Sequence, residues 1–258
     1  MISDFTEKIV KKKNEGKIVM LTCYDYQMAK ILDKTDIDMI LVGDSLGMVI
    51  KGEKDTKNVT VEEVNYHLKA VRKGTKNKPV IADMPINSFK NREIALKNAL
   101  IFINSGADGV KIEGNHPEII SFLVKNRINV MGHIGLLPQF YKKYKIVGKN
   151  KEERERLKKD ALEIEKNGTF SVVLESIPES LGKEITEKLK IPTIGIGAGT
   201  CCDGQILVIN DILGMDPEFS PRYVKKYLNL YDTINKAVKM FSQEVKDGKY
   251  PSKQYVYE

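Results

Sequence analysis

Short apolar segments alternate with longer amphipathic segments along the whole of this sequence, and this alternation limits the folds open to it. Eight of the short segments are rich in β-branched residues and are predicted strands: 18–23, 39–43, 80–83, 109–113, 130–133, 171–175, 193–196 and 205–209. Six longer segments carry apolar residues at spacings of three and four and are predicted helices: 26–34, 61–73, 92–105, 117–126, 152–167 and 178–189. Strand–helix alternation repeated about eight times favours a closed α/β structure, the (β/α)₈ TIM barrel, over an open doubly wound sheet.

The length of the chain agrees with a single barrel. At 258 residues it matches the roughly 250 residues of a typical (β/α)₈ domain. We therefore expect one catalytic domain, residues 1–258, with a C-terminal helical extension of one or two helices in 221–247. The glycine-rich segment 195–199 has no obvious helix after it. It is either a tight turn at the end of a strand or a loop that contacts a ligand.

The charge and cysteine content exclude several classes of protein. The formal net charge is +7, but the lysines are mixed with glutamates, as in 151–156, and this favours a solvated helix face over a nucleic-acid-binding surface. Residues 1–13 lack the apolar core of a secretory signal, and no apolar run approaches the roughly 20 residues of a membrane span. Three cysteines, two of them adjacent, indicate reduced thiols rather than a disulfide framework. We therefore expect a cytoplasmic protein with no membrane or nucleic-acid partner.

Polar side chains stand at or just beyond the carboxyl ends of five successive predicted strands, the second to the sixth. In chain order they are Asp44 and Ser45, Asp83, Lys111 and Glu113, His133, and Glu175. In a barrel these strand ends surround one mouth, where enzymes of this fold place their chemistry. Any one of the carboxylates could instead be a helix cap. Four carboxylates, a lysine and a histidine in these places together predict an active site.

The residue types in this cluster indicate the kind of chemistry. Several oxygen ligands without paired cysteines and histidines favour a hard cation such as Mg²⁺ over Zn²⁺. A 2-oxo acid could chelate that ion, which would acidify the neighbouring C–H and stabilise an enolate, while a carboxylate removes the proton. Lys111 would neutralise the substrate carboxylate, or would form an internal salt bridge to Glu113 or Asp83.

Three other polar residues near strand ends or in helices have simpler interpretations. We interpret His67 as a surface or packing residue, because it lies in the middle of a predicted helix. His116 precedes Pro117 and is expected to be a capping or loop residue. Asp25 either caps the helix that follows it or lines the site, and we favour the cap.

Nearly the whole chain, about residues 21–250, resembles the ketopantoate hydroxymethyltransferase family. The segments that carry the resemblance are TCYD (22–25), LVGDSLGM (41–48), YH (66–67), AVR (70–72), ADMP (82–85), VKIEG (110–114), GHIGL (132–136), LESIP (174–178), IGIGAG (194–199) and CDGQ (202–205). Each segment alone is weak, but their order and intervals together are specific. The loop 52–60 is more charged than the family pattern, Leu137 replaces a threonine, and 139–149 is slightly short. These departures affect mouth loops and folate contacts and leave the metal and base positions in place.

The resemblance implies a (β/α)₈ barrel that transfers a hydroxymethyl group from 5,10-methylenetetrahydrofolate to 3-methyl-2-oxobutanoate in pantothenate synthesis. By matching motifs, it implies that Asp44 and Asp83 bind Mg²⁺ and that Glu113 completes the metal site directly or through water. The oxo acid would be contacted by Asp44, Ser45, Asp83 and Lys111. Glu175 would be the base at C3, and His133 would support the pocket. It also implies a homo-oligomer, commonly a decamer. Two alternatives remain: a Mg²⁺-dependent lyase or mutase of the isocitrate lyase type, and a basic binding protein without enzyme activity.

Overall fold

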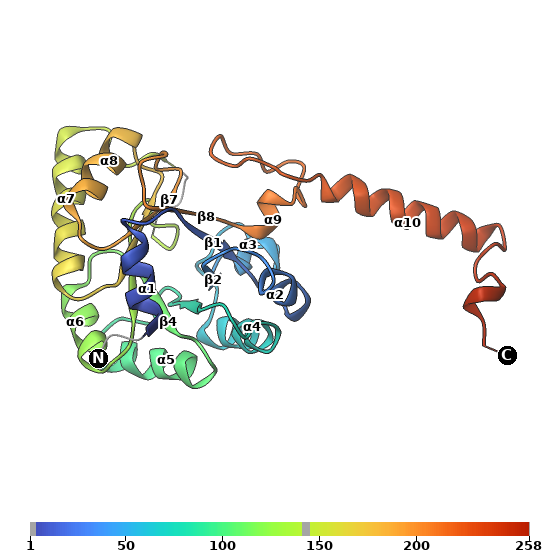
Figure 1. Ribbon diagram of the computed structural model, residues 1–258, viewed down its shortest axis with the longest axis horizontal. Helices are drawn as coiled ribbons and strands as arrows, with labels where there is room; N and C mark the ends of the chain where they lie inside the picture. Colours follow the sequence, from blue (N-terminus) through green and yellow to red (C-terminus); the bar gives the residue numbers. More distant parts are fainter. Residues whose placement is uncertain (1–3, 141–144, 258) are drawn as a thin grey trace. The chain divides into compact units, whose positions relative to one another are not determined.

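Eight parallel strands close into a barrel in the order of the sequence (Figure 1). The computed structural model describes residues 4–140 and 145–257. Its strands are β1 Ile18–Thr22, β2 Met39–Val42, β3 Val80–Asp83, β4 Gly109–Glu113, β5 Val130–Gly135, β6 Ser171–Glu175, β7 Thr193–Ile196 and β8 Gly204–Leu207. Strand β1 pairs with both β2 and β8, which closes the barrel. The predicted fold class is confirmed, and each predicted strand end lies within two residues of the observed one. The last predicted strand ran too far, since Ile209 begins a helix.

Helices follow six of the strands, as predicted, with ends within two residues of those expected. These helices are α2 Tyr26–Leu32, α4 Val61–Gly74, α5 Arg92–Asn104, α6 Pro117–Lys125, α7 Lys151–Lys166 and α8 Glu179–Lys188. Four further elements were not predicted: α1 Asp4–Lys12, the one-turn helices α3 Leu46–Val49 and α9 Ile209–Ile212, and a 3₁₀ turn at Lys253–Tyr255. The one-turn helices are too short to show a periodic apolar pattern.

Side-chain caps fix where several of these helices begin. The Asp25 carboxylate accepts a hydrogen bond of 2.8 Å from the backbone N–H of Met28, which confirms its predicted role as a cap. At the start of α4, Thr60 and Glu63 form a reciprocal capping box. These residues therefore fix the first turns of α2 and α4.

The barrel interior is filled by alternate residues of the strands, which point to one side because successive side chains of a strand face opposite ways. Buried core residues include Ile18 and Met20 of β1, Met39 and Leu41 of β2, Ile81 of β3, Met131 of β5, Val173 of β6, Ile194 of β7 and Ile206 of β8. Helix α1 contributes Ile9 to this core, and the Phe5 ring meets Phe170 edge-on at 5.6 Å. Because Phe170 directly precedes β6, α1 packs at the end of the barrel where the strands begin. This leaves the opposite end for the polar side chains.

The connection from β7 to β8 is a tight turn without a described helix. Gly197 and Gly199 in this turn have φ values of 64° and 88°, in the region that favours glycine. A Cβ on Gly199 would also lie 2.4 Å from a side-chain carbon of Glu179. The turn interpretation of the glycine-rich segment is therefore supported.

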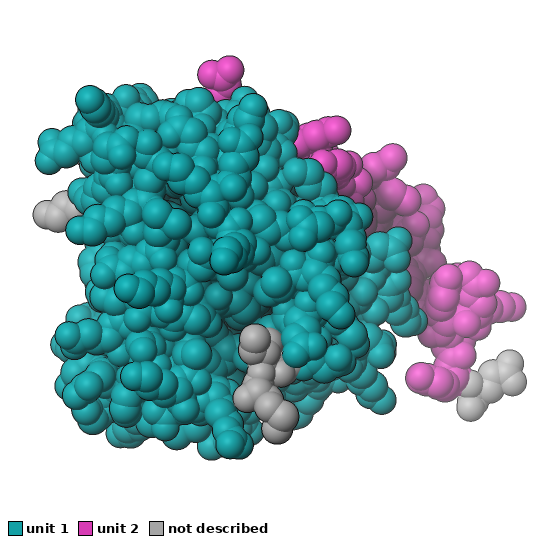
Figure 2. Space-filling model, turned by 60° about the vertical axis from the view of Figure 1, so that its left-hand side comes forward, with its two compact units in different colours: residues 1–208 teal, residues 209–258 magenta. Residues whose placement is uncertain are grey.

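The chain divides into two compact units, residues 1–208 and 209–258 (Figure 2). The second unit contains α9 and α10 Leu230–Lys246. The predicted start of the tail helix at residue 221 was wrong, because helical structure begins only after Asn229, whose side chain accepts from the N–H of Asp232. The expectation of one domain with a helical extension stays a prediction.

No helix in the described ranges is both long and apolar enough to cross a membrane. Residues 141–144, inside the segment that is short for the family, lie outside the described residues.

We expect Gly204→Ala to destabilise the closure of the barrel. A Cβ at this position would lie 2.5 Å from the backbone oxygen of Ile18 and 2.8 Å from Cδ1 of Ile194. Overpacking of this kind costs about 1–3 kcal/mol, and urea unfolding followed by circular dichroism measures the loss. Gly16→Ala is the matched control, because nothing lies within 4 Å of its Cβ position. Equal stability of the two variants would contradict a tight β1–β8 closure.

Candidate active site

The strands place the predicted site residues directly above the apolar core. Residues two apart on a strand share a face, so Asp83 follows Ile81, His133 follows Met131 and Glu175 follows Val173 on the inner side of the barrel. The strand register sets Asp83 opposite Lys111 and Glu113 opposite His133. The predicted residues of β3 to β6 therefore converge at the carboxyl ends of the strands, which we call the mouth.

Lys111 lies at the centre of the cluster and is almost completely buried. Its Nζ is 2.9 Å from Oδ1 of Asp83, 3.7 Å from Oε1 of Glu113 and 3.2 Å from Nδ1 of His133. Burial alone would lower the pKa of this ammonium, but the charges of Asp83, Glu113 and Asp44 raise it above its usual value. The internal salt bridges that the sequence left open are thus both present, and Lys111 stays charged.

His133 lies between two glutamates. Its Nδ1 is 3.5 Å from Oε1 of Glu113, and its Nε2 is 3.2 Å from Oε2 of Glu175. Burial and the nearby Lys111 charge oppose protonation, but Glu113 and Glu175 outweigh them and raise the pKa of His133 to about 9. Burial disfavours the charged form of Glu113, yet His133 and Lys111 hold the pKa of that carboxyl below its usual value. His133 and Glu113 therefore form a buried ion pair beside Glu175.

Asp44 and Asp83 form the other side of the cluster, on neighbouring strand ends. The backbone N–H of Asp44 donates to Oδ2 of Asp83 at 3.3 Å, and both carboxylates are buried. Burial raises the pKa of each, and the charge of Asp83 raises that of Asp44 further. A cation beside these two buried carboxylates would offset the repulsion between their charges.

Ser45 is the least buried of the predicted site residues. It precedes helix α3 but makes no side-chain capping bond. Its hydroxyl instead lies 2.8 Å from the hydroxyl of Tyr24. Tyr24 is itself fixed by His67, whose Nδ1 is 2.6 Å from the Tyr24 carbonyl oxygen. His67 was expected to be a surface or packing residue, and its ring instead bonds the loop that carries Tyr24.

Two residues at this site were not singled out from the sequence. Tyr24 lies in the segment 22–25, where only Asp25 was considered. Gln139 is completely buried, and its side-chain amide donates 2.8 Å to Oδ2 of Asp44. A signal for Gln139 was present, since it is a polar residue after the largely apolar segment 134–138.

The donor atoms of the cluster suit a hard cation. Oδ1 of Asp83 is buried and makes no aligned hydrogen bond with any described residue, although Lys111 lies 2.9 Å away as an ion pair. Nε2 of His133 is also buried and makes no aligned hydrogen bond with any described residue, although Oε2 of Glu175 lies 3.2 Å away. Within the described residues, no three His, Cys, Asp or Glu side chains are arranged as a ready cage for a metal. Asp44 and Asp83 could therefore supply two ligands, with the remaining oxygens coming from substrate or water, as Mg²⁺ commonly accepts.

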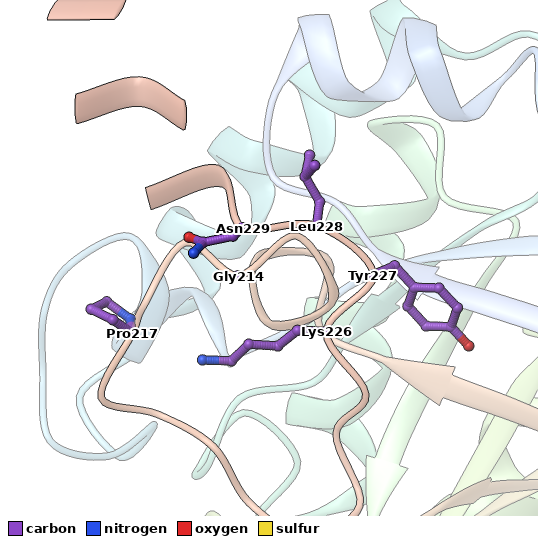
Figure 3. Close-up of a pocket in the computed structure, with 6 residues that line it drawn as sticks. All are labelled: Gly214, Pro217, Lys226, Tyr227, Leu228 and Asn229. Atoms are coloured by element: carbon purple, nitrogen blue, oxygen red, sulfur yellow. The ribbon is translucent and has the colours of Figure 1, made fainter. Parts of the chain in front are cut away.

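The second unit contains a separate hollow of about 460 Å³. Six residues line it, and Figure 3 shows their side chains: Gly214, Pro217, Lys226, Tyr227, Leu228 and Asn229. None of them is a predicted site residue, and none carries a carboxylate. The hollow therefore lacks the donor set that the strand ends provide.

We expect His133 to stabilise the metal-free protein most at lower pH. A histidine whose pKa is raised on folding contributes fully below its unfolded value, about 6.5, and loses that contribution as pH rises through the folded value. For His133 that upper limit is about 9. The difference in unfolding free energy between the parent chain and His133→Gln should therefore shrink from pH 6.5 to 9, measured by urea unfolding in the presence of a chelator.

His116→Gln serves as the control for this measurement. Burial lowers the pKa of His116, so its effect on stability should change only below about pH 6.5. A constant difference between the parent chain and His133→Gln over pH 6.5–9 would contradict a protonated His133 in the folded chain.

Comparison with solved structures identifies the architecture. The chain matches a phosphonopyruvate hydrolase with a TM-score of 0.64 over 99% of this chain and 92% of that one, at 11% identity. It matches a 2,3-dimethylmalate lyase of the PEP mutase/isocitrate lyase superfamily with a TM-score of 0.63, over 98% of this chain and 92% of that one, at 12% identity. At such identities the likeness establishes the fold alone.

Comparison with curated sequences is far more specific. A 3-methyl-2-oxobutanoate hydroxymethyltransferase of Thermotoga neapolitana is 49% identical over 97% of this chain and 95% of its own length. Enzymes of the same description from Pyrococcus furiosus and Clostridium botulinum are 46% and 49% identical, over 98% and 95% of this chain and 91% and 92% of their own lengths. The family model for ketopantoate hydroxymethyltransferase matches residues 4–253. By this full-length match, and with the strand-end residues of its motifs gathered at one mouth, the chain belongs to the ketopantoate hydroxymethyltransferase family.

Proposed function

We propose that this chain carries out its family's hydroxymethyl transfer to 3-methyl-2-oxobutanoate in the mouth of the barrel, with Glu175 as the base. The observation that carries the assignment is the continuous series of buried charges from Asp83 through Lys111 and Glu113 to His133 and Glu175. Family membership sets aside the two alternatives, a lyase or mutase and a binding protein without activity. The family implies 5,10-methylenetetrahydrofolate as the cosubstrate.

Asp44 and Asp83 are the proposed ligands of Mg²⁺, and Glu113 is proposed to reach the ion through water. Both oxygens of Glu113 already have protein partners, since Oε1 faces His133 and Oε2 accepts from the backbone N–H of Gln139 at 3.2 Å. The four carboxylates of Asp44, Asp83, Glu113 and Glu175 are buried together with only two basic side chains, Lys111 and His133. When bound there, the ion supplies charge stabilisation at the keto oxygen of the substrate.

Lys111 and Ser45 are proposed to orient the oxo acid. The buried ammonium of Lys111 offers the substrate carboxylate a fixed positive charge in a site that excludes bulk water. The Ser45 hydroxyl has no capping role and is held by Tyr24, so it can donate to a substrate oxygen without disturbing helix α3. Together these groups would place the C3 hydrogen of the substrate toward β6.

Glu175 is proposed to remove the C3 proton. Its carboxylate is mostly buried at the end of β6, and its Oε2 lies 3.2 Å from Nε2 of His133, a contact that orients the carboxylate for proton removal. The electron pair of the C3–H bond moves toward the keto group, and C3 then attacks the one-carbon unit of the folate. Attack on the methylene carbon of the folate iminium forms the new C–C bond, and the electron pair of the C=N bond moves to the folate nitrogen. Water then forms a C–O bond to the methylene carbon as its C–N bond breaks, the leaving nitrogen of tetrahydrofolate takes up a proton, and the hydroxymethyl group remains on C3.

We further propose a cytoplasmic homo-oligomer, with a decamer as the expected form. Helix α10 supports association, because none of its residues is buried although Ile234, Val238, Phe241 and Val245 recur at spacings of three and four. An apolar stripe of this kind on a helix is normally covered. The three cysteines are free, as expected for a reducing compartment.

We expect Glu175→Gln to retain binding of Mg²⁺ and the oxo acid but to lose proton exchange at C3. Removal of a general base costs about 10²–10⁴-fold in rate. Proton NMR of 3-methyl-2-oxobutanoate in D₂O, with Mg²⁺ and without folate, follows the exchange directly. Glu179→Gln is the control, because this glutamate is exposed in the first turn of α8 and bonds Thr200. Normal exchange in Glu175→Gln would remove Glu175 as the base.

We expect Asp83→Asn to raise the Mg²⁺ concentration needed for half-maximal C3 exchange by at least about tenfold. The amide keeps the shape of the side chain but removes a negative charge from the proposed ion site. A Mg²⁺ titration of the exchange rate measures this shift. Asp36→Asn, an exposed position before β2, should leave the titration unchanged. An unaltered Mg²⁺ requirement in Asp83→Asn would exclude Asp83 as a ligand.

A further inference from the structure

Gln139 joins three neighbouring strand ends from the loop that follows β5. Its Nε2 donates 2.8 Å to Oδ2 of Asp44 and 3.0 Å to the backbone oxygen of Met84. Its backbone N–H donates 3.2 Å to Oε2 of Glu113. A single residue thus contacts two of the three proposed metal-site carboxylates.

The orientation of the Gln139 amide follows from its partners. A carboxylate oxygen and a carbonyl oxygen both accept hydrogen bonds, so the NH₂ group must face Asp44 and Met84. Its Oε1 then points elsewhere, and this atom is buried without a hydrogen bond to any described residue. A buried acceptor without a partner is costly. The amide therefore holds Asp44 with its NH₂ group and leaves its oxygen as an acceptor for a bound water.

We propose that Gln139 is a positioning residue of the metal site, which holds the Asp44 carboxylate in place for the ion and makes ion binding depend on the loop after β5. The inference rests on the proposed function, because it requires Asp44 to be a ligand. The 2.8 Å hydrogen bond from Gln139 sets the position of Oδ2 of Asp44, and the 3.2 Å bond to Glu113 connects the same residue to a second proposed ligand. Without the amide donor, Oδ2 of Asp44 would lose this bond and the position that it sets.

If the role of Gln139 were purely structural, packing of its side chain in the loop would be sufficient for it. The loop already has apolar anchors in Ile134 and Leu136, both buried. An apolar side chain of similar length would fill the same volume, and it would leave both Asp44 and Met84 without their donor. A substitution that keeps the side-chain volume and removes the amide therefore separates the hydrogen bonding of Gln139 from its packing in the loop.

Binding of Mn²⁺ in the absence of substrate, followed by electron paramagnetic resonance, tests the inference. Gln139→Met should weaken Mn²⁺ binding about 10–100-fold, the usual effect of removing a residue that orients a metal ligand. Gln205→Met is the matched control, because the Gln205 amide bonds the Gly199 carbonyl and contacts no proposed ligand. Saturating Mg²⁺ should restore much of the lost kcat in Gln139→Met, because the chemical groups themselves are intact.

Hydrogen exchange supplies a second measurement that does not depend on activity. Mg²⁺ should slow exchange of the backbone amides in residues 136–140 of the parent chain, and less so in Gln139→Met. If Gln139→Met does not fold, Gln139→Asn is used instead, since its shorter amide cannot reach both partners and should also weaken Mn²⁺ binding at least tenfold.

The outcomes separate this inference from the proposed metal site. Unchanged Mn²⁺ affinity in a folded Gln139 variant, with binding lost in Asp44→Asn, would overturn the role of Gln139 and leave the metal site standing. Absence of Mn²⁺ binding in the parent chain would overturn the metal site and this inference with it. Weakened binding in the Gln139 variant but not in Gln205→Met supports the inference.

Discussion

The buried ammonium of Lys111 holds the mouth of the barrel together. It lies within ion-pair distance of Asp83 and Glu113 and close to His133, so residues from three neighbouring strands meet at one charge. Four carboxylates in a protein interior would otherwise protonate or repel one another. Because Lys111 and protonated His133 offset part of this charge, Glu113 stays ionised and Glu175 has a cation beside it.

The barrel fold can hold this polar cluster because the cluster lies at the carboxyl ends of the strands, apart from the apolar core. On β3, β5 and β6, the residue two positions before the site residue points the same way and is apolar: Ile81 before Asp83, Met131 before His133 and Val173 before Glu175. Helix α1 packs at the opposite end through Phe5 and Ile9. The apolar core therefore fills one end and the middle of the barrel, and the polar cluster lies at the other end.

The same architecture occurs in a phosphonopyruvate hydrolase and a 2,3-dimethylmalate lyase at 11% and 12% identity. The fold thus accommodates several reactions, and the identity of the reaction depends on the side chains at the strand ends. Here the family is established by a match over almost the whole chain, and the geometry adds how the matched residues contact one another. The Glu113–His133–Glu175 series and the Gln139–Asp44 bond are features of that geometry.

The sequence by itself determined the eight strands, the six covering helices, the family and the charged residues at the strand ends, because each depends on local periodicity or on short motifs. The tertiary structure alone decided which of these residues pair. Gln139 meets Asp44 across 95 positions of sequence, and His67 meets Tyr24 across 43. Such contacts arise only when the strands close into a barrel and bring distant loops to one end. Helix α1 was not predicted for a similar reason, because its apolar residues Phe5 and Ile9 find their packing partners only in the completed core.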